Sequence, residues 1–257
     1  MERGTMTGIP TYDCLRLKQG EPEKWLRWDF WAASHDVAWL QDVRGGTPGR
    51  IPPSLLARLF RQGGTPHADP GECRTAFVAR WDAEQLYVAF LAADTSIWYT
   101  YAHRDDPLYD EEVVEIFLAP RGELTHYFEL ELNPGNVIFD ADVHSPHLLR
   151  ATMTVDRSWT CTGLKTRIHA TLPVHREPGG AGRSTEGGVR AGVWIALWQI
   201  PWAGLGEPPP VPGAVWRGNF YRIDRGPSDR YLAWSPTGED PPNFHVPPRF
   251  GRILFVA

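Results

Sequence analysis

The sequence is poor in cysteine and in net positive charge, and each shortage excludes a class of protein. Its three cysteines, Cys14, Cys73 and Cys161, are odd in number and far apart, so neither a disulfide framework nor a clustered zinc site is indicated. The net charge of -5 and the pI near 6.0 offer no basic face for phosphate groups. Nucleic acid and anionic membranes are therefore not expected as partners.

Long apolar runs are also missing. No stretch of the sequence approaches the roughly 18 apolar residues of a membrane span. The N-terminal stretch MERGTMTGIPTYDC lacks the charged and apolar regions of a secretory signal peptide. We therefore expect a cytoplasmic location by default, and we make no prediction of the oligomeric state.

The sequence does contain many short segments that alternate between apolar and polar residues. Such alternation, punctuated by Gly, Pro, Asp and Asn, is typical of strands joined by turns. One exception, PPSLLARLFRQGG, begins with prolines, carries an apolar stripe and ends with glycines, which predicts a helix. The predicted fold is all-β: a single β-sandwich of two antiparallel sheets with one short inserted helix. We predict strands at residues 38–43, 75–81, 85–92, 97–101, 113–118, 126–132, 136–140, 148–154, 162–169, 193–200, 216–224, 231–234 and 252–256.

The segment DDPLYDEEVVEIFLAP places a carboxylate inside a predicted strand. Because successive side chains on a strand point to opposite faces, Glu115 shares a face with Phe117, whereas Ile116 points the other way. The next strand repeats the pattern with Glu129 and Glu131. If APRGEL is a hairpin connection, these glutamates lie on one sheet face. That face is either the solvated side of an antiparallel sheet or a site for a ligand.

Aromatic residues and the C-terminal region favour the second interpretation. The chain has 12 Trp, 8 Tyr and 11 Phe, more large rings than a core readily absorbs, since each Trp N–H also needs a partner. Rings beside carboxylates and amides suit a sugar, which offers an apolar face and hydroxyl groups. The loop WSPTGEDPPNFHVPPRFG carries Trp234, Asn243 and His245, and its prolines favour a preset binding loop.

Several segments together resemble a known family. EQLYVAFLAAD, DDPLYDEEVVEIFL, YFELELNPGN, WRGNFYRID, LAWSPT and FHVPPRFGRILF are similar to the family-nine carbohydrate-binding module, and more closely to its free-standing family-nine-like branch within the DOMON-type β-sandwich group. The similarity covers residues 30–257, so residues 1–29 are taken as an N-terminal extension. It implies a single sandwich, often extracellular and often with bound calcium, with a sugar slot between two aromatic rings and a role in polysaccharide metabolism.

The resemblance also assigns site residues. Tyr109 stands six residues before Glu115, the family's spacing between the first ring and the glutamate that takes sugar hydroxyls, with tyrosine in place of the usual tryptophan. Trp234 matches the second ring. The other candidates are at or near positions where the family has polar groups, or could supply a donor in their place: Asn219, Arg222, Tyr231 and Glu129.

We therefore predict a non-catalytic protein that binds a mono- or oligosaccharide. One alternative is a glycoside hydrolase-like enzyme that uses Glu115 with Glu129 or Glu131 as an acid and base pair. A further alternative is a haem-binding module of the DOMON type, for which Met153 is the methionine outside the N-terminal tail.

No cofactor is assigned from the residues, and calcium is expected only from the resemblance. The histidines, including His126 and His144, are scattered along the sequence without metal-ligand spacing. The turn VHSPH places His144 and His147 three residues apart, which is only weakly compatible with a metal site.

Overall fold

The computed structural model describes residues 8–18, 21, 24–25, 27, 30–31, 34, 36–45, 74–177, 192–226 and 229–257. The strands in this part of the chain are β1 (Thr11–Arg16), β2 (Ala38–Trp39), β3 (Gln41–Asp42), β4 (Thr75–Trp81), β5 (Gln85–Asp94), β6 (Val113–Ala119), β7 (His126–Leu132), β8 (Ile138–His144), β9 (Thr154–Asp156), β10 (Lys165–Ala170), β11 (Gly192–Pro201), β12 (Val215–Asp224), β13 (Arg230–Ala233) and β14 (Gly251–Val256). Short 3₁₀ turns lie between them: η3 (Leu108–Asp110), η4 (Pro120–Gly122), η5 (Arg150–Thr152), η6 (Ala203–Leu205) and η7 (Pro247–Arg249).

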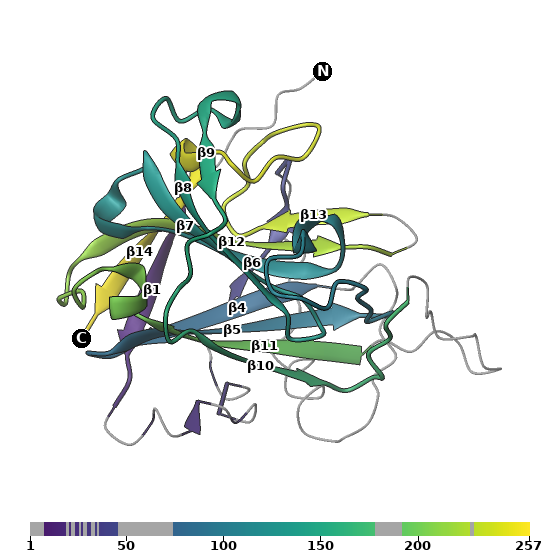
Figure 1. Cartoon of the computed structure of the whole chain (residues 1–257). Coiled ribbons are helices and arrows are strands. Elements are labelled where there is room, and N and C mark those ends of the chain that lie inside the picture. Colours follow the sequence, from purple (N-terminus) through teal and green to yellow (C-terminus); the bar gives the residue numbers. More distant parts are fainter. Residues whose placement is uncertain are drawn as a thin grey trace.

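The strands form one continuous mixed sheet. Its order is β10-β11-β5-β4-β1-β14-β12-β6-β7-β8-β9, and β13 pairs with β12 beside this path. Strand β1 runs parallel to both β14 and β4, whereas the other strand pairs are antiparallel. We call β10, β11, β5 and β4 the first arm, and β14, β12, β6, β7, β8 and β9 the second arm. The two arms lie one above the other (Figure 1).

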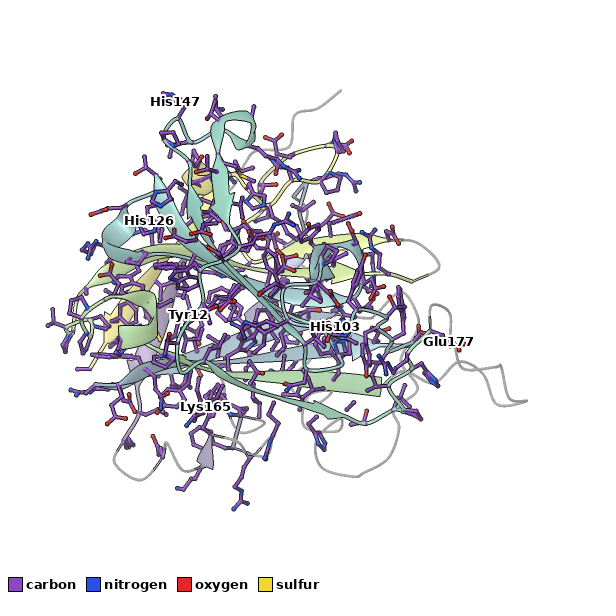
Figure 2. All side chains as sticks on the ribbon, in the orientation of Figure 1. Tyr12, His103, His126, His147, Lys165 and Glu177 are labelled. Atoms are coloured by element: carbon purple, nitrogen blue, oxygen red, sulfur yellow. The ribbon has the colours of Figure 1, made fainter. Side chains whose placement is uncertain are left out.

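The sheet curls so that the inner faces of its two arms pack together. Phe77 of β4 stacks on Phe220 of β12 with ring centroids 3.7 Å apart, although two strands separate β4 from β12 in the sheet order. Tyr12 of β1 lies between the arms (Figure 2), with its ring centroid 4.9 Å from that of Phe77. Val114 and Ile116 point into this same core. The curl therefore buries one face of each arm without a second, separate sheet.

The all-β class is thus confirmed, but the predicted sandwich of two antiparallel sheets is not, because the described strands belong to one curled mixed sheet. The predicted helix at residues 52–64 lies outside the described residues. Two predicted strands are absent: residues 97–101 make one isolated bridge, between Trp98 and His175, and residues 148–154 contain the turn η5. Strand β1 lies within the predicted N-terminal extension, and its parallel pairing with distant segments left no local hairpin signal.

The outer face of the second arm carries a second apolar cluster. Phe117, Tyr127, Tyr221 and Phe244 belong to it, and the segment between β13 and β14 supplies Phe244. Phe244 stacks on Tyr221 with ring centroids 4.1 Å apart. This covering segment turns the outer face into a sheltered surface. Among the described residues, no helix has both the length and the apolar character that crossing a membrane requires.

Candidate functional site

Strand pairing places the glutamates on the outer face of the second arm. Glu115 of β6 pairs with Glu131 of β7 and, on its other side, with Tyr221 of β12. Glu129 pairs with Phe117. Because directly paired residues share a face, the register confirms that Glu115, Glu129 and Glu131 point the same way, opposite to the core side chains of β6 and β7. The period-two pattern of the sequence is what produces this arrangement.

A pocket of about 340 Å³ lies over these carboxyl groups. This volume is within the usual range for small-molecule sites. Strands of the second arm, the adjacent β13 and the segment after β13 contribute to the wall of the pocket. The lining residues are Tyr109, Asp110, Glu115, Glu129, Phe139, Arg150, Met153, Val155, Arg157, Ile223, Arg225, Tyr231, Pro242, Asn243, Phe244 and His245.

Tyr109 lines one side of the pocket. It lies in the turn η3 that precedes β6, and its ring meets Phe139 of β8 edge-on at 5.8 Å. Arg157 donates a hydrogen bond to its hydroxyl oxygen at 3.0 Å, and the same guanidinium lies 5.8 Å from the ring centroid. The tyrosine is half-buried. Its ring is therefore held in place while part of it still faces the solvent.

Tyr231 lines the side of the pocket that β13 forms. It pairs with Ile223 of β12 and therefore stands on the same outer face. Arg225 donates to its hydroxyl oxygen at 2.8 Å and lies over the ring at 5.3 Å. Since β12, β6 and β7 lie between β13 and β8 in the sheet, Tyr231 and the Tyr109–Phe139 pair stand on opposite sides of the glutamates.

The three glutamates form a buried cluster at the base of the pocket. One carboxylate oxygen each of Glu115, Glu129 and Glu131 lies within 4.8 Å of the others, and none of the three residues is more than 4% exposed. Among the described residues, no arginine or lysine is within ion-pair distance of them. In the described part of the chain, one oxygen of Glu115 and both oxygens of Glu131 have no hydrogen-bond partner outside this cluster. Such groups are costly to bury, so their presence calls for an explanation.

Burial changes the protonation of this cluster. It raises the pKa of Glu115 well above its ordinary value, and the nearby Glu129 raises it further. Burial raises the pKa of Glu129 to about 7, although a hydrogen bond from Glu131 opposes the shift. The pKa of Glu131 also rises, first through burial and then through the charges of Glu115 and Glu129. All three shifts favour the protonated carboxyl group, which can both donate and accept hydrogen bonds.

The segment after β13 brings a histidine beside the cluster. His245 Nε2 lies 3.8 Å from a carboxylate oxygen of Glu129, and its Nδ1 is hydrogen-bonded to the Tyr127 hydroxyl at 2.9 Å. Burial lowers the pKa of His245 to about 3, so the imidazole is neutral at pH 7. Asn243 Oδ1 accepts a hydrogen bond from the backbone N–H of His245 at 3.1 Å. The side-chain NH₂ group of Asn243 therefore remains available as a donor.

Three of the predicted site residues lie elsewhere. Trp234 is 6% exposed and packs in the inner core, edge-on to Phe77 at 5.6 Å. A Cβ atom on Gly251 would come within 2.1 Å of the Trp234 ring, so only glycine fits against it. The ring is enclosed and does not line the pocket.

Arg222 and Asn219 are also committed to other contacts. Arg222 lies on the inner face, where its guanidinium donates to Asp94 at 2.5 Å and to Glu112 at 3.1 Å. Asn219 stands on the outer face but is fully buried, and its amide exchanges hydrogen bonds with the Ser235 backbone. It therefore anchors the segment after β13. Of the predicted residues, the pocket brings together Tyr109, Glu115, Glu129 and Tyr231.

Calcium requires six to eight oxygen ligands, and two carboxylate groups offer side chains of this kind. The group of Asp94, Glu112 and Asp224 already surrounds Arg222, so these carboxyl groups have a cationic partner within the protein. The group of Glu115, Glu129 and Glu131 has oxygens to spare but only three side chains. The expectation of calcium therefore remains a prediction without an assigned ligand set.

Sequence reasoning missed the arginines that frame the pocket. Arg150 and Arg157 line it, and both lie in irregular segments beside β9. Arg150 lies within the segment that was wrongly predicted as a strand and forms η5 instead, and Arg157 follows β9, so their positions depend on how β8 and β9 pair rather than on a local signal. Asn243 and His245 were recognisable because they sit in a proline-rich loop that favours binding.

Comparison with known proteins places the fold. No family model matches the sequence. An "Extracellular protein" of Arthroderma benhamiae is 25% identical over 184 residues, covering 68% of this chain and 76% of that protein. The crystal structure of a proposed carbohydrate-binding protein from Bacteroides uniformis is similar with a TM-score of 0.65 and 16% identity, over 96% of this chain and 100% of that one. A carbohydrate-binding module of family 9 from Caldicellulosiruptor kristjanssonii, solved with glucose, gives a TM-score of 0.46 and 16% identity over 72% and 77%. The likeness to the Bacteroides protein shows a shared fold.

Proposed function

We propose that this protein binds a mono- or oligosaccharide in the outer-face pocket without catalysing a reaction. The observation that carries the proposal is that one pocket combines two half-buried tyrosine rings, Tyr109 and Tyr231, with the buried carboxyl groups of Glu115 and Glu129. The rings suit the apolar face of a sugar, and the carboxyl groups suit its hydroxyls. The fold shared with a proposed carbohydrate-binding protein supports the same reading.

The protonation of the cluster fits this role. A sugar hydroxyl both donates and accepts hydrogen bonds, and so does a carboxyl group that keeps its proton. The raised pKa of Glu115 favours the protonated form that offers both functions, and Glu129, with a pKa of about 7, exists in both forms at neutral pH. Hydroxyl groups of a bound sugar would supply partners for buried oxygens that otherwise have none.

In this proposal the second aromatic ring is Tyr231 rather than Trp234. Trp234 and Arg222 support the second arm from its inner face, and Asn219 fixes the segment that carries His245. Membership of the DOMON-type group and the binding of calcium remain predictions from the resemblance.

Calorimetric titration with a broad panel of mono- and oligosaccharides tests the proposal. We expect saturable binding in the millimolar to micromolar range, order of magnitude, because a shallow pocket buries little ligand. A parallel thermal-shift screen, with and without calcium chloride, should show a rise in Tm for the same sugars, since a ligand of the folded state stabilises it. The absence of heat and of any shift across the panel would contradict the proposal.

Paired variants locate the site. Tyr109→Ala should weaken sugar binding by about tenfold or more, because a stacking ring contributes on the order of 1 kcal/mol or more. The matched control is Tyr99→Ala, which removes a tyrosine that does not line the pocket. Equal loss in both variants would argue that the pocket is not where the sugar binds.

A second candidate function is glycoside hydrolysis. Glu115 and Glu129 both line the pocket, with carboxylate oxygens less than 4.8 Å apart, and retaining glycosidases hold their carboxyl groups about 5–5.5 Å apart. Release of a reducing sugar or of nitrophenol from glycosides of a sugar that binds, abolished by Glu115→Gln, would favour the enzyme. Binding without turnover would favour the primary proposal.

The haem alternative has one observation in its favour. Met153 and His245, residue types that ligate haem iron, both line the pocket. However, both contact the same Tyr127 hydroxyl, Met153 through its sulfur at 4.0 Å and His245 at 2.9 Å. An absorption spectrum of the purified protein after incubation with haemin tests this alternative. Haem binding predicts a Soret band, and Met153→Leu or His245→Gln should shift the wavelength of that band.

A further inference from the structure

A second group of potential ligands lies on β7 and β8, away from the pocket. His126, Asp142 and His144 place one potential ligand atom each within 4.8 Å of one another. His126 pairs directly with His144 across the two strands, and Asp142 precedes His144 by two residues on the same strand. Because pairing and two-residue spacing both keep side chains on one face, the three groups converge although the sequence separates them.

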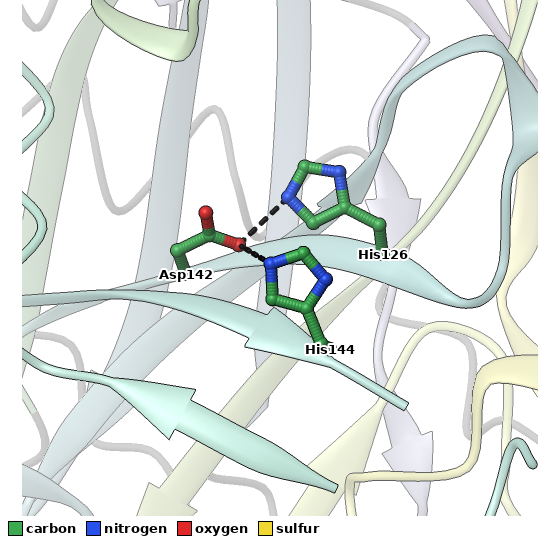
Figure 3. A group of neighbouring side chains, drawn as sticks. All are labelled: His126, Asp142 and His144. Atoms are coloured by element: carbon green, nitrogen blue, oxygen red, sulfur yellow. Dashed lines mark hydrogen bonds and ion pairs between the residues drawn. The ribbon is translucent and has the colours of Figure 1, made fainter. Parts of the chain in front are cut away.

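The geometry of the group suits a metal ion. Nε2 of both histidines faces the same Oδ1 of Asp142, at 2.7 Å for His126 and 3.5 Å for His144 (Figure 3). Nitrogen and oxygen ligands held about 2.1 Å from a tetrahedral ion lie about 3.4 Å apart. The observed separations bracket this value, and the contact between His126 Nε2 and Asp142 Oδ1 would lengthen when an ion enters.

The rings are already ordered. The two imidazoles stack with centroids 4.6 Å apart and planes 8° from parallel. Phe128 meets the His126 ring edge-on at 5.1 Å and is itself stacked on Trp159 at 4.7 Å. This support limits the rotamers of His126, so less entropy is lost when a ligand is bound.

The group is also accessible. The side chains of His126, Asp142 and His144 are 29%, 22% and 57% exposed, so an ion can enter from solvent. The site is separate from the pocket, because His126 shares the face of its neighbour Phe128, an inner-core residue, whereas Tyr127 and Glu129 stand on the outer face.

We propose that His126, Asp142 and His144 bind a borderline divalent transition-metal ion such as Zn²⁺, Cu²⁺ or Ni²⁺. Two imidazole nitrogens and one carboxylate oxygen are the ligand set that such ions prefer, whereas Ca²⁺ and Mg²⁺ favour oxygen alone. Three protein ligands leave at least one coordination position for water or an added ligand, as in open zinc sites.

The test uses the full chain without an affinity tag, treated with a chelator and then dialysed. Titration with zinc chloride in a calorimeter should show one high-affinity equivalent that an excess of calcium chloride does not displace. His126→Gln, His144→Gln and Asp142→Asn should each weaken zinc binding by about tenfold or more, because loss of an outer-shell partner alone has that effect. Two outcomes would overturn the proposal. One is the absence of saturable zinc binding, and the other is zinc binding that is as strong in all three variants as in the unaltered protein.

His103→Gln is the matched control. His103 is a single exposed histidine beside one carboxylate, Asp106, at 3.5 Å, and it lies well away from His126 (Figure 2). Zinc binding should be unchanged in this variant.

A second readout covers the case in which a variant folds poorly. In long-range ¹H–¹⁵N spectra of the unaltered protein, the Nε2 signals of His126 and His144 should shift on addition of one equivalent of zinc. Shifts confined to other histidines would contradict the proposal. Sugar binding should stay unchanged on addition of zinc, so the two sites are tested independently.

Discussion

Two groups of three buried carboxylates lie in the part of the chain that the structure describes, and their surroundings differ. Asp94, Glu112 and Asp224 surround the Arg222 guanidinium between the arms, and Arg230 adds a further ion pair to Asp224. On the outer face, Glu115, Glu129 and Glu131 face a pocket, with no arginine or lysine among the described residues at ion-pair distance. The protein itself supplies the first group with two cationic partners. The second has unused hydrogen-bonding capacity directed at a cavity, as a binding site requires.

The pKa shifts of the two groups show the same contrast. Burial raises the pKa of Glu112, but Arg222 opposes that shift. For Glu115, burial and the charge of Glu129 act in the same direction. A buried arginine therefore offsets the burial of Glu112, whereas no cation among the residues that the structure describes offsets the burial of Glu115.

Removing the cation should have the largest effect. Arg222→Met leaves three buried carboxylates without their central partner, and we expect the free energy of unfolding to fall by about 3–5 kcal/mol. Urea unfolding followed by circular dichroism measures this. The control Arg44→Met breaks exposed ion pairs to Asp42 and Asp240 and should cost at most about 1 kcal/mol. Equal losses in both variants would remove the distinction between the two groups.

The pH dependence of stability should report the outer group. Glu129 has a folded-state pKa of about 7 against an ordinary value of 4.5, so between these values the folded state binds more protons than the unfolded state. Its contribution is fully present below pH 4.5 and is lost as pH rises through 7, by about 3 kcal/mol. Glu115 and Glu131, with pKa values also raised, change stability in the same direction.

Urea unfolding at a series of pH values checks this dependence. Glu129→Gln should flatten the decline, whereas Glu123→Gln, which removes a carboxylate that is 57% exposed, should leave it unchanged. Stability that rises across this pH range in the unaltered protein would contradict the assignment.

Trp234, the residue that follows β13, provides a smaller test. Trp234→Phe should lower the free energy of unfolding by about 1–3 kcal/mol, since it leaves a cavity in the inner core, and sugar affinity should not change. Calorimetry and urea unfolding on the same variant separate the two effects. A loss of sugar affinity at unchanged stability would return Trp234 to the binding site.

The smallest expected effect concerns the opposite face of that strand. Tyr231→Phe removes a hydroxyl at the pocket and should weaken sugar binding by about 1 kcal/mol, roughly fivefold, with little change in Tm. Tyr99→Phe serves as the control. An unchanged affinity in Tyr231→Phe would restrict the role of this residue to its ring.

The faces of β6 and β7 could be predicted from the sequence because alternation with a period of two is a local property. Alternation would also have assigned Trp234 to the inner core once the face of Tyr231 was known. Leu232 and Trp234 both point inward, opposite to Tyr231. That face depends on the pairing of Tyr231 with Ile223, which is not local. Arg222 alternates with Tyr221 in the same way, so the two side chains point to opposite faces. The ion pair of Arg222 could not be predicted, because its partner Asp94 lies 128 residues away.

The convergence of His126 with Asp142 and His144 shows the same limit of sequence reasoning. The residues are scattered in sequence, and only the register of β7 against β8 brings them together. The curl of the sheet was equally inaccessible, because parallel pairing of β1 with both arms leaves no turn between the paired segments.

The position of β1 has a consequence for how the chain reaches its native state. Tyr12 is in register with Ile253 and Leu15 with Arg80, so the strand that links the arms joins segments from opposite ends of the sequence. Contacts of such long sequence separation slow folding, because the closure entropy is lost before the contact is gained. During synthesis β1 can therefore complete its pairing only after β14 has been made, although its partner β4 is present much earlier.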